Sequence, residues 1–182
     1  MTLGRLIAVV GPSGVGKDSV MRGIHSAMPK LHLVRRVITR AAEPDGEAHD
    51  TVSLSEFQDL VDNGAFAVHW QAHGLHYGIP QIVKYHLNKG TDCMANFSRS
   101  ALGQVSELFP RLVVLNITAN PATLADRLAA RGRETEGDIA KRLAQADKPL
   151  PAGLEVIHLA NDRPLEQTVA CALTLLRPEA VE

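Results

Sequence analysis

The sequence carries almost no net charge, has only two cysteines and lacks any long hydrophobic run. Its formal net charge is -1 over 182 residues, so we expect no bulk electrostatic binding to nucleic acid or to a membrane. The apolar run at 6–10 is too short for a signal peptide or a membrane span, and we expect a cytoplasmic protein. Cys93 and Cys171 are far apart and make no metal or disulfide spacing, which favours two buried thiols.

The chain does contain enough apolar residues for one hydrophobic core. Hydrophobic residues make up 45% of it, and its length suits a single domain spanning residues 1–182. The sequence shows neither an internal repeat nor a low-complexity linker, so nothing in it divides the chain.

Apolar runs alternate with amphipathic segments along the chain. Strands are predicted at residues 6–10, 33–39, 65–72, 92–97, 111–118 and 156–159. Helices are predicted at residues 17–28, 53–63, 80–87, 120–131, 138–146 and 165–176, with start signals at Ser53 and at Asn120-Pro121. Residues 42–50, with Pro44 and Gly46, form a polar turn. This alternation predicts an α/β sandwich with a parallel central sheet, in which a ligand binds at the carboxyl ends of the strands.

A glycine-rich turn lies between the first predicted strand and the first predicted helix. It fits the Walker A spacing G-x-x-x-x-G-K, and its residues are Gly11, Pro12, Ser13, Gly14, Val15, Gly16 and Lys17. In such a loop, backbone N–H groups point at phosphate oxygens, the following helix presents its positive N-terminus, and the lysine reaches the β- and γ-phosphates. Because the loop follows a buried strand and opens a helix, it predicts a triphosphate site rather than a turn that binds nothing.

The residue after Lys17 departs from that pattern. A serine or threonine that holds Mg²⁺ normally stands there, whereas this chain has Asp18 followed by Ser19. A carboxylate beside the β-phosphate would repel it unless a cation lay between them, and carboxylates are good ligands for Mg²⁺. We therefore expect Asp18 to be a metal ligand, directly or through water. The alternative is that Asp18 only caps the helix and that Ser19 contacts the metal.

Arginines gather in two successive predicted helices. Arg127 and Arg131 are four residues apart and share one helix face, and Arg133 and Arg142 follow. In a phosphoryl-transfer enzyme, arginines on a mobile lid neutralise the charge that develops on the transferred group. We expect such a lid here; the alternative is a solvated surface on which these arginines pair with neighbouring carboxylates.

Five stretches of the sequence together form a pattern that is specific enough to indicate a protein family. They are Gly-Pro-Ser-Gly-Val-Gly-Lys-Asp-Ser at 11–19, Val-Ile-Thr-Arg at 37–40, residues 64–80, Asn-Phe-Ser-Arg at 96–99 and Arg-Leu-Ala-Ala-Arg-Gly-Arg-Glu at 127–134. Through them nearly the whole chain resembles the guanylate kinase family, and within it the ribose 1,5-bisphosphate phosphokinases of phosphonate metabolism. The resemblance implies a guanylate kinase-like P-loop fold with a core at about 1–34 and 91–182, an acceptor-binding insertion at about 35–90 and an arginine lid at about 127–147.

The resemblance also implies roles for individual residues. In that family an arginine and a tyrosine hold the acceptor phosphate, and Arg40 and Tyr77 stand at their places. The lid arginines of the family fall on Arg127, Arg131 and Arg142. Asn161 resembles the family's stretch near the adenine.

The positions that read guanine depart from the guanylate kinase pattern. Val68 stands in place of a base-reading glutamate and Arg36 in place of a serine. The acidic pair on the strand near the acceptor becomes Asn96 and Ser98, followed by Arg99. A site that has lost these hydrogen-bond partners should bind GMP poorly. Arg36 and Arg99 suit a more anionic acceptor, such as a sugar with two phosphates.

The resemblance and these departures together imply a transferase that uses ATP and Mg²⁺. It would phosphorylate ribose 1,5-bisphosphate to 5-phosphoribosyl 1-diphosphate (PRPP), with a small sugar phosphate rather than nucleic acid or a membrane as partner. One alternative is a nucleoside monophosphate kinase acting on GMP, which the lost guanine contacts disfavour. The second is an inactive guanylate kinase-like interaction module, which the intact P-loop disfavours.

Histidines cluster beside the only tryptophan of the chain. On a strand, His69 and His73 share one face and Trp70 lies on the other. We expect the polar face to be the ligand face, with His49 in the polar turn as a further candidate contact to a phosphate. Zinc is disfavoured because neither a cysteine nor a carboxylate completes a ligand set with these histidines and His76.

Overall fold

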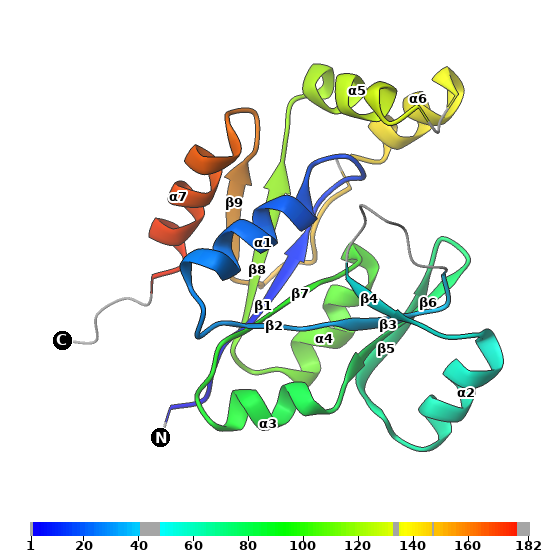
Figure 1. Ribbon diagram of the computed structural model, residues 1–182, viewed down its shortest axis with the longest axis vertical. Coiled ribbons are helices and arrows are strands. Elements are labelled where there is room, and N and C mark those ends of the chain that lie inside the picture. The colour runs from blue at the N-terminus through cyan, green and yellow to red at the C-terminus, as the bar shows by residue number, and fades with distance from the viewer. Residues whose placement is uncertain (1, 41–47, 133–134, 147, 178–182) are drawn as a thin grey trace.

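The computed structural model describes residues 2–40, 48–132, 135–146 and 148–177. It contains two β-sheets surrounded by helices, a five-stranded sheet and a four-stranded sheet that lies at the lower right of Figure 1. Pro44 and Gly46 of the predicted polar turn, and Arg133 of the predicted lid, lie outside the described residues.

The larger sheet is built from the runs that the sequence predicts as buried strands. Its strands are β1 (Leu6–Val10), β2 (His32–Leu33), β7 (Cys93–Asn96), β8 (Leu112–Thr118) and β9 (Val156–Ala160). They lie in the order β2-β7-β1-β8-β9, and every neighbouring pair is parallel. All five residues of β1 are buried, as expected for a central strand covered on both faces. The predicted parallel α/β sheet is therefore confirmed.

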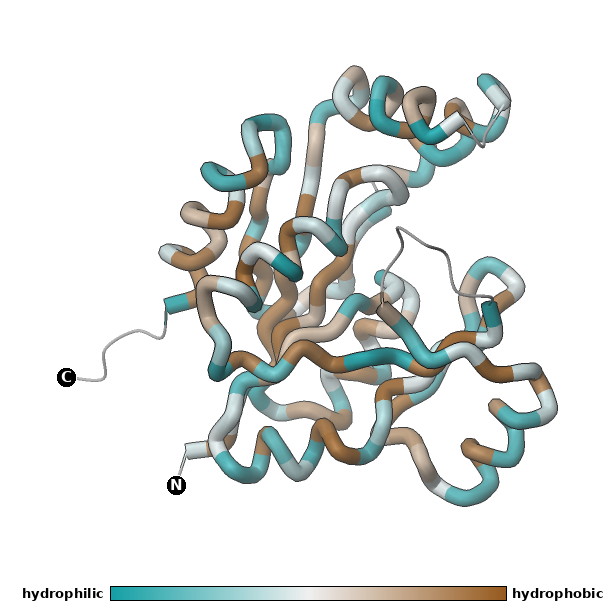
Figure 2. Tube along the Cα trace, in the orientation of Figure 1, coloured by the Kyte–Doolittle hydropathy of each residue, from teal (hydrophilic) through white to brown (hydrophobic). Residues whose placement is uncertain are grey.

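Helices cover both faces of the larger sheet. α1 (Lys17–Ala27) and α7 (Leu165–Leu175) pack together on one face, and α3 (Ile82–Asn88) and α4 (Leu102–Leu108) contribute to the core on the other. Figure 2 shows the apolar residues concentrated along the strands of this sheet. In the part of the chain that the structure describes, no helix is both long and apolar enough to span a bilayer.

The smaller sheet contains β4 (His49–Thr51), β3 (Arg36–Ile38), β6 (Leu75–Pro80) and β5 (Phe66–Ala72), in that spatial order. β3 pairs with β4 in parallel and with β6 in antiparallel, and β5 and β6 form a hairpin. α2 (Leu54–Asp62) packs on one face, here called the α2 face, where the rings of Phe57 and Phe66 stack at 4.9 Å. The opposite face, here called the core face, carries Trp70 and Tyr77 into the main hydrophobic core.

The prediction of one strand at 33–39 is wrong, because the two ends of this segment join different sheets. The N–H of Val34 still donates to the carbonyl of Met94 in the larger sheet, at 2.9 Å. Three residues later, Val37 pairs with Gly78 of the smaller sheet. The chain therefore crosses from one sheet to the other in the middle of what reads as a continuous run.

Four further features differ from the prediction. The strand β6 was not predicted, because its short segment ends in Gly-Ile-Pro. The helix α4 was not predicted either, because its seven residues are too few to show a clear helical period. His49 begins β4 instead of lying in the polar turn. Cys171 is exposed on α7, whereas Cys93 is buried as predicted.

The ends of two helices follow the signals in the sequence. Ser53 and Glu56 form the predicted capping box at the start of α2. The side chain of Asn120 accepts a hydrogen bond from the N–H of Thr123 at 2.9 Å, and Pro121 takes the first position of α5 (Pro121–Ala130). α6 (Glu136–Ala144) follows, and this pair of helices lies at the top of Figure 1, next to the loop that leaves β1.

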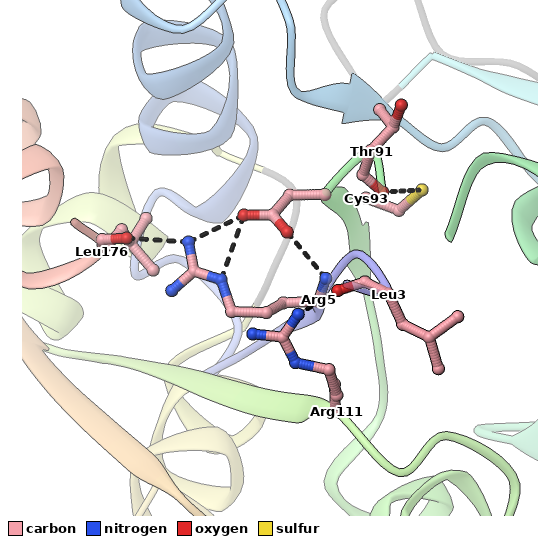
Figure 3. Close-up of polar contacts among 7 residues, drawn as sticks. Leu3, Arg5, Thr91, Cys93, Arg111 and Leu176 are labelled. Carbon is pink, nitrogen blue, oxygen red and sulfur yellow. Dashed lines mark hydrogen bonds and ion pairs between the residues drawn. The ribbon is translucent and has the colours of Figure 1, made fainter. Parts of the chain in front are cut away.

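Polar contacts fix the amino edge of the larger sheet (Figure 3). Arg5, just before β1, forms an ion pair with Asp92 at 2.7 Å and donates to the carbonyl of Leu176 at 2.9 Å. Arg111, just before β8, donates to the carbonyl of Leu3. These contacts join the starts of β1, β7 and β8 to the end of α7 and so stabilise the strands whose opposite, carboxyl ends carry the loops.

Candidate active site

The glycine-rich loop at 11–17 leaves the carboxyl end of β1 and leads into α1. Gly16 has a φ of 92°, and a Cβ atom there would lie 2.9 Å from Nδ2 of Asn161. A Cβ atom on Gly11 would lie 2.4 Å from the carbonyl oxygen of Ile117 in β8. A side chain at Gly11 would collide with β8, and one at Gly16 would meet the amide of Asn161 at a φ that other residues rarely adopt, so the path of the loop requires glycine.

The backbone donors of this loop are arranged for an anion. Within the described ranges, the N–H groups of Ser13, Gly14 and Gly16 make no hydrogen bond to another part of the protein, whereas the N–H of Val15 donates to the carbonyl of Pro12 at 3.3 Å. α1 begins directly after Gly16 without a side-chain cap, so its positive end also faces the loop. These donors fit a chain of phosphates.

Lys17 and the two residues after it fit the charges of a metal–triphosphate complex. Nζ of Lys17 donates to the carbonyls of Gly11 at 2.9 Å and Pro12 at 3.2 Å, so the side chain folds back over the loop. Asp18 and Ser19 lie in the first turn of α1, and both are partly buried. Their carboxylate and hydroxyl oxygens are hard ligands of the kind that Mg²⁺ prefers.

A polar network on the side of β9 holds the P-loop. Asn161, which follows β9, is 5% exposed, and its Nδ2 donates to the carbonyl of Val15 at 2.8 Å. Arg127 of α5 donates to the same carbonyl at 3.2 Å and to the carbonyl of Asn161 at 2.8 Å. The sequence predicts a lid arginine and a nucleotide contact here. The structure instead engages both side chains with main-chain oxygens that belong to the loop and its support.

The other two predicted lid arginines differ in their surroundings. Arg142 of α6 donates a hydrogen bond to Oγ of Ser13 in the P-loop, so α6 already reaches the phosphate site. Arg131, at the end of α5, is exposed, and the structure gives it no hydrogen bond or ion pair among the described residues. Of the three arginines, Arg127 and Arg142 contact the P-loop, Arg127 through the carbonyl of Val15 and Arg142 through Oγ of Ser13.

Three of the predicted acceptor residues come together on the core face of the smaller sheet. The ring of Tyr77 stacks on Trp70 with centroids 5.3 Å apart, and Cζ of Arg36 lies 5.0 Å from the Tyr77 centroid. Nε1 of Trp70 donates to Oγ of Ser98 at 2.9 Å, and Trp70 also stacks on Phe97 at 5.1 Å. We call these five residues the acceptor cluster.

Arg40 follows β3 and has a donor without a partner. Its Nε is buried and makes no hydrogen bond in the described chain. Its carbonyl oxygen accepts from Oγ1 of Thr51 at 3.0 Å and lies 3.2 Å from Nε2 of His49. A buried cationic N–H without an acceptor costs free energy, which an anionic ligand would recover.

Arg99 lies at the start of the short helix η1 (Arg99–Ala101), directly after Ser98, which stands between β7 and this helix. Its Nη1 donates to the carbonyls of Gln145 at 3.3 Å and Lys148 at 3.4 Å, which follow α6. The structure thus places Nη1 of Arg99 beside the segment that follows α6, and its role as an acceptor ligand stays a prediction.

The polar side of β5 lies against α2, away from the acceptor cluster. The ring centroids of His69 and His76 lie 6.4 Å and 5.4 Å from that of Phe57. These histidines therefore lie on the α2 face, whereas Trp70 and Tyr77 lie on the core face, and ligand binding by the polar face stays a prediction. In the described ranges, no group of three or more histidines, cysteines and carboxylates could hold a metal ion.

The sequence analysis assigned no role to two members of the acceptor cluster, Phe97 and Trp70, and of these Trp70 makes a side-chain hydrogen bond within the cluster. Its place on the apolar side of β5 reads as core packing, and it is indeed only 8% exposed. The signal that could have found it is its indole N–H, because a buried tryptophan usually needs a hydrogen-bond acceptor. Ser98, already a candidate on other grounds, supplies that acceptor.

The comparisons with known proteins agree with a P-loop kinase. The sequence model of the guanylate kinase family matches residues 3–170. The crystal structure of guanylate kinase from Anaplasma phagocytophilum aligns over 100% of this chain and 89% of that one, with a TM-score of 0.71 and 20% identity. The chain therefore belongs to the guanylate kinase family.

Two relatives narrow that class. Ribose 1,5-bisphosphate phosphokinase PhnN of Ruegeria sp. (strain TM1040) is 46% identical over 177 residues, which are 97% of this chain and 93% of that one. The protein of the same name from Agrobacterium fabrum is 45% identical over 178 residues, 96% of this chain and 97% of that one. Within the guanylate kinase family, the chain belongs to the branch of these phosphokinases.

Proposed function

We propose that the protein transfers the γ-phosphoryl group of ATP to ribose 1,5-bisphosphate, giving PRPP and ADP. The observation that carries the proposal is the similarity to the PhnN phosphokinases, because it spans the P-loop, the acceptor cluster and the lid together. In this reaction an oxygen of the 1-phosphate attacks the γ-phosphorus, and the bond from that phosphorus to the β–γ bridging oxygen breaks. The attacking oxygen is already ionised, so no general base is required.

The P-loop would bind the triphosphate of ATP. The N–H groups of Ser13, Gly14 and Gly16 would donate to phosphate oxygens, and Lys17 would exchange its loop carbonyls for the β- and γ-phosphates. Asp18 and Ser19 would hold Mg²⁺, directly or through water. Mg²⁺ held there would offset the negative charge of the triphosphate.

The lid arginines would neutralise the negative charge of the γ-phosphoryl group during its transfer. Arg142 is the best placed, because exchanging Oγ of Ser13 for a γ-phosphate oxygen needs only a local movement of its side chain. Arg131 would join it when the lid closes. Arg127 would act by holding the P-loop and Asn161, rather than by contacting the phosphoryl group.

The acceptor would bind between the smaller sheet and the P-loop. Arg40, with its buried Nε, and Tyr77 would hold one phosphate of the sugar. Arg36 and Ser98 would contact the remaining polar groups. We assign Arg99 to the contacts that hold the lid, because its carbonyl partners follow α6. The single domain would divide into the core, the acceptor-binding region and the lid that the sequence suggests.

The two alternative functions have less support. A GMP kinase would need partners for a base edge, and the acceptor cluster offers mainly aromatic rings and a guanidinium. An inactive interaction module would not need glycines at Gly11 and Gly16, where any side chain would collide with a neighbouring strand or with Asn161.

Coupled release of ADP tests the proposal. Purified protein with MgATP is offered ribose 1,5-bisphosphate or GMP, and we expect turnover with the bisphosphate alone. Lys17→Met should lower kcat by about 10²-fold or more, whereas Lys84→Met, an exposed lysine on α3, should leave it unchanged. Turnover with GMP alone would overturn the acceptor, and turnover with neither would revive the interaction module.

The metal ligands are tested by the dependence of kcat on Mg²⁺ concentration. Asp18→Ser restores the usual P-loop residue and should shift the Mg²⁺ concentration required for half-maximal activity, while Ser19→Ala should shift it less. If Asp18→Ser left the Mg²⁺ dependence unchanged and Ser19→Ala altered it, Ser19 would be the ligand and Asp18 a helix cap.

A further inference from the structure

Trp70 is the only tryptophan of the chain, and it lies at the centre of the acceptor cluster. It stands directly opposite Tyr77 in the β5–β6 register, and their rings are nearly parallel, with an interplanar angle of 9°. Its indole also stacks on Phe97, and Cζ of Arg36 lies 6.0 Å from its centroid. Every aromatic neighbour that could stack on a ligand in this cluster is therefore already in contact with Trp70.

The cluster is also closed to solvent. Trp70 and Tyr77 are each 8% exposed, Phe97 is 3% exposed and Arg36 is 5% exposed. A planar base recognised here would need an open aromatic face and a polar partner for its edge. The face of Tyr77 is covered by Trp70, and Oγ of Ser98 already accepts the indole N–H at 2.9 Å.

The indole thus meets the same two groups that a purine would use. Both ring systems are flat and bicyclic, both stack on a phenol ring, and both carry an N–H that a serine hydroxyl can accept. Because the indole is covalently held in β5, it fills this position at all times. The guanidinium of Arg36 stays beside it as a cationic group suited to phosphate or to sugar oxygens.

We propose that Trp70 is a specificity-determining residue that occupies the place of a nucleotide base and so restricts the acceptor to sugar phosphates. The proposal rests on the acceptor site assigned above. It implies that exclusion of nucleotides comes from filled volume as well as from missing hydrogen-bond partners. Removing the indole should admit a base, whereas removing its hydrogen bond alone should not.

The test compares Trp70→Ala with Phe57→Ala, which removes a ring of similar burial from the α2 face of the same sheet. With MgATP and GMP, we expect kcat/KM of Trp70→Ala to rise at least about tenfold over wild type, mainly through a lower KM. Phe57→Ala and Ser98→Ala should show no such gain. Added indole, which can refill the cavity, should abolish the gain in Trp70→Ala.

Two further arms keep the outcome clear. If Trp70→Ala does not fold, as judged by circular dichroism, Trp70→Leu replaces it, and Trp70→Phe should keep the wild-type preference. Equal GMP kinetics in the folded Trp70 variants, wild type and Phe57→Ala would overturn the proposal. Failure of wild type to use ribose 1,5-bisphosphate would instead overturn the proposed function, and a gain with GMP in Trp70→Ala would still support the role of Trp70.

Discussion

Substitution of Arg127 best distinguishes two possible roles of this residue, as a lid arginine that contacts the transferred phosphoryl group or as an arginine that holds the P-loop. Replacing it by methionine keeps the packing of the stem but removes two charged hydrogen bonds, to the carbonyls of Val15 and Asn161. The carbonyl of Val15 still accepts a hydrogen bond from Nδ2 of Asn161 in this variant, whereas the carbonyl of the buried Asn161 loses the hydrogen bond that Arg127 donates to it. Leaving such a group unpaired costs about 1–3 kcal/mol, so we expect Arg127→Met to lose about 2 kcal/mol of folding free energy.

That loss corresponds to a Tm about 4–8 °C lower, since 1 kcal/mol shifts the Tm of a domain of this size by about 2–4 °C. Because the support of the P-loop is disturbed, KM for ATP should rise while kcat changes little. Arg142→Met should do the reverse: kcat falls by about 10²-fold or more, and the Tm moves by less than about 2 °C because the side chain is exposed.

The assays are thermal unfolding and steady-state kinetics with ATP varied. Arg131→Met is the matched control for thermal unfolding, since Arg131 is exposed on the same helix face and makes no hydrogen bond or ion pair to the described residues that its loss could break. The reasoning is refuted if Arg127→Met melts within about 1 °C of wild type and loses about 10³-fold in kcat with an unchanged KM for ATP. That result would make Arg127 the lid arginine that the sequence predicts.

Three other predictions concern single groups. Burial, and then the nearby charge of His86, lower the pKa of His32 below its usual 6.5. The free energy of unfolding should therefore be highest above about pH 6.5 and should decrease as the pH falls toward the pKa of His32 in the folded protein. Urea unfolding between pH 5 and 7.5 should show this slope, and His32→Asn should flatten it; an equal slope in both proteins would contradict it. Burial raises the pKa of the Cys93 thiol to about 12, so a thiol reagent at pH 8 should label the exposed Cys171 quickly and Cys93 only on unfolding. Ribose 1,5-bisphosphate should change the emission of Trp70 in the absence of ATP, and an unchanged spectrum at saturation would place the acceptor elsewhere.

The P-loop and its flanking elements could be predicted because their signals are local. The strand, the glycine spacing and the helix lie within about 20 consecutive residues, and each residue constrains its neighbours directly. The helix caps at Ser53 and Asn120 are local in the same sense, since a cap contacts a residue three positions away. The predictions that depend only on such short distances agree with the structure.

The prediction of one strand at 33–39 failed because it depends on distant partners. Whether Val34 or Val37 belongs to the larger sheet is decided by Met94 and Gly78, which lie far along the chain, and a continuous apolar run gives no sign of the division. The different partners of Arg127 and Arg131 could not be predicted for the same reason, because the two residues share a helix face and only the tertiary position of Asn161 distinguishes them.

The two faces of the smaller sheet differ in how far their polar side chains are buried. His69 is exposed on the α2 face, whereas Arg36 and Tyr77 are buried on the core face. Burying a guanidinium is costly unless other groups compensate it, so its presence on the apolar face carries more information than exposed histidines do. Nε of Arg40 is buried and has no acceptor among the described residues, so phosphate oxygens of a ligand would supply one; this is the physical reason to look for the acceptor next to Arg40.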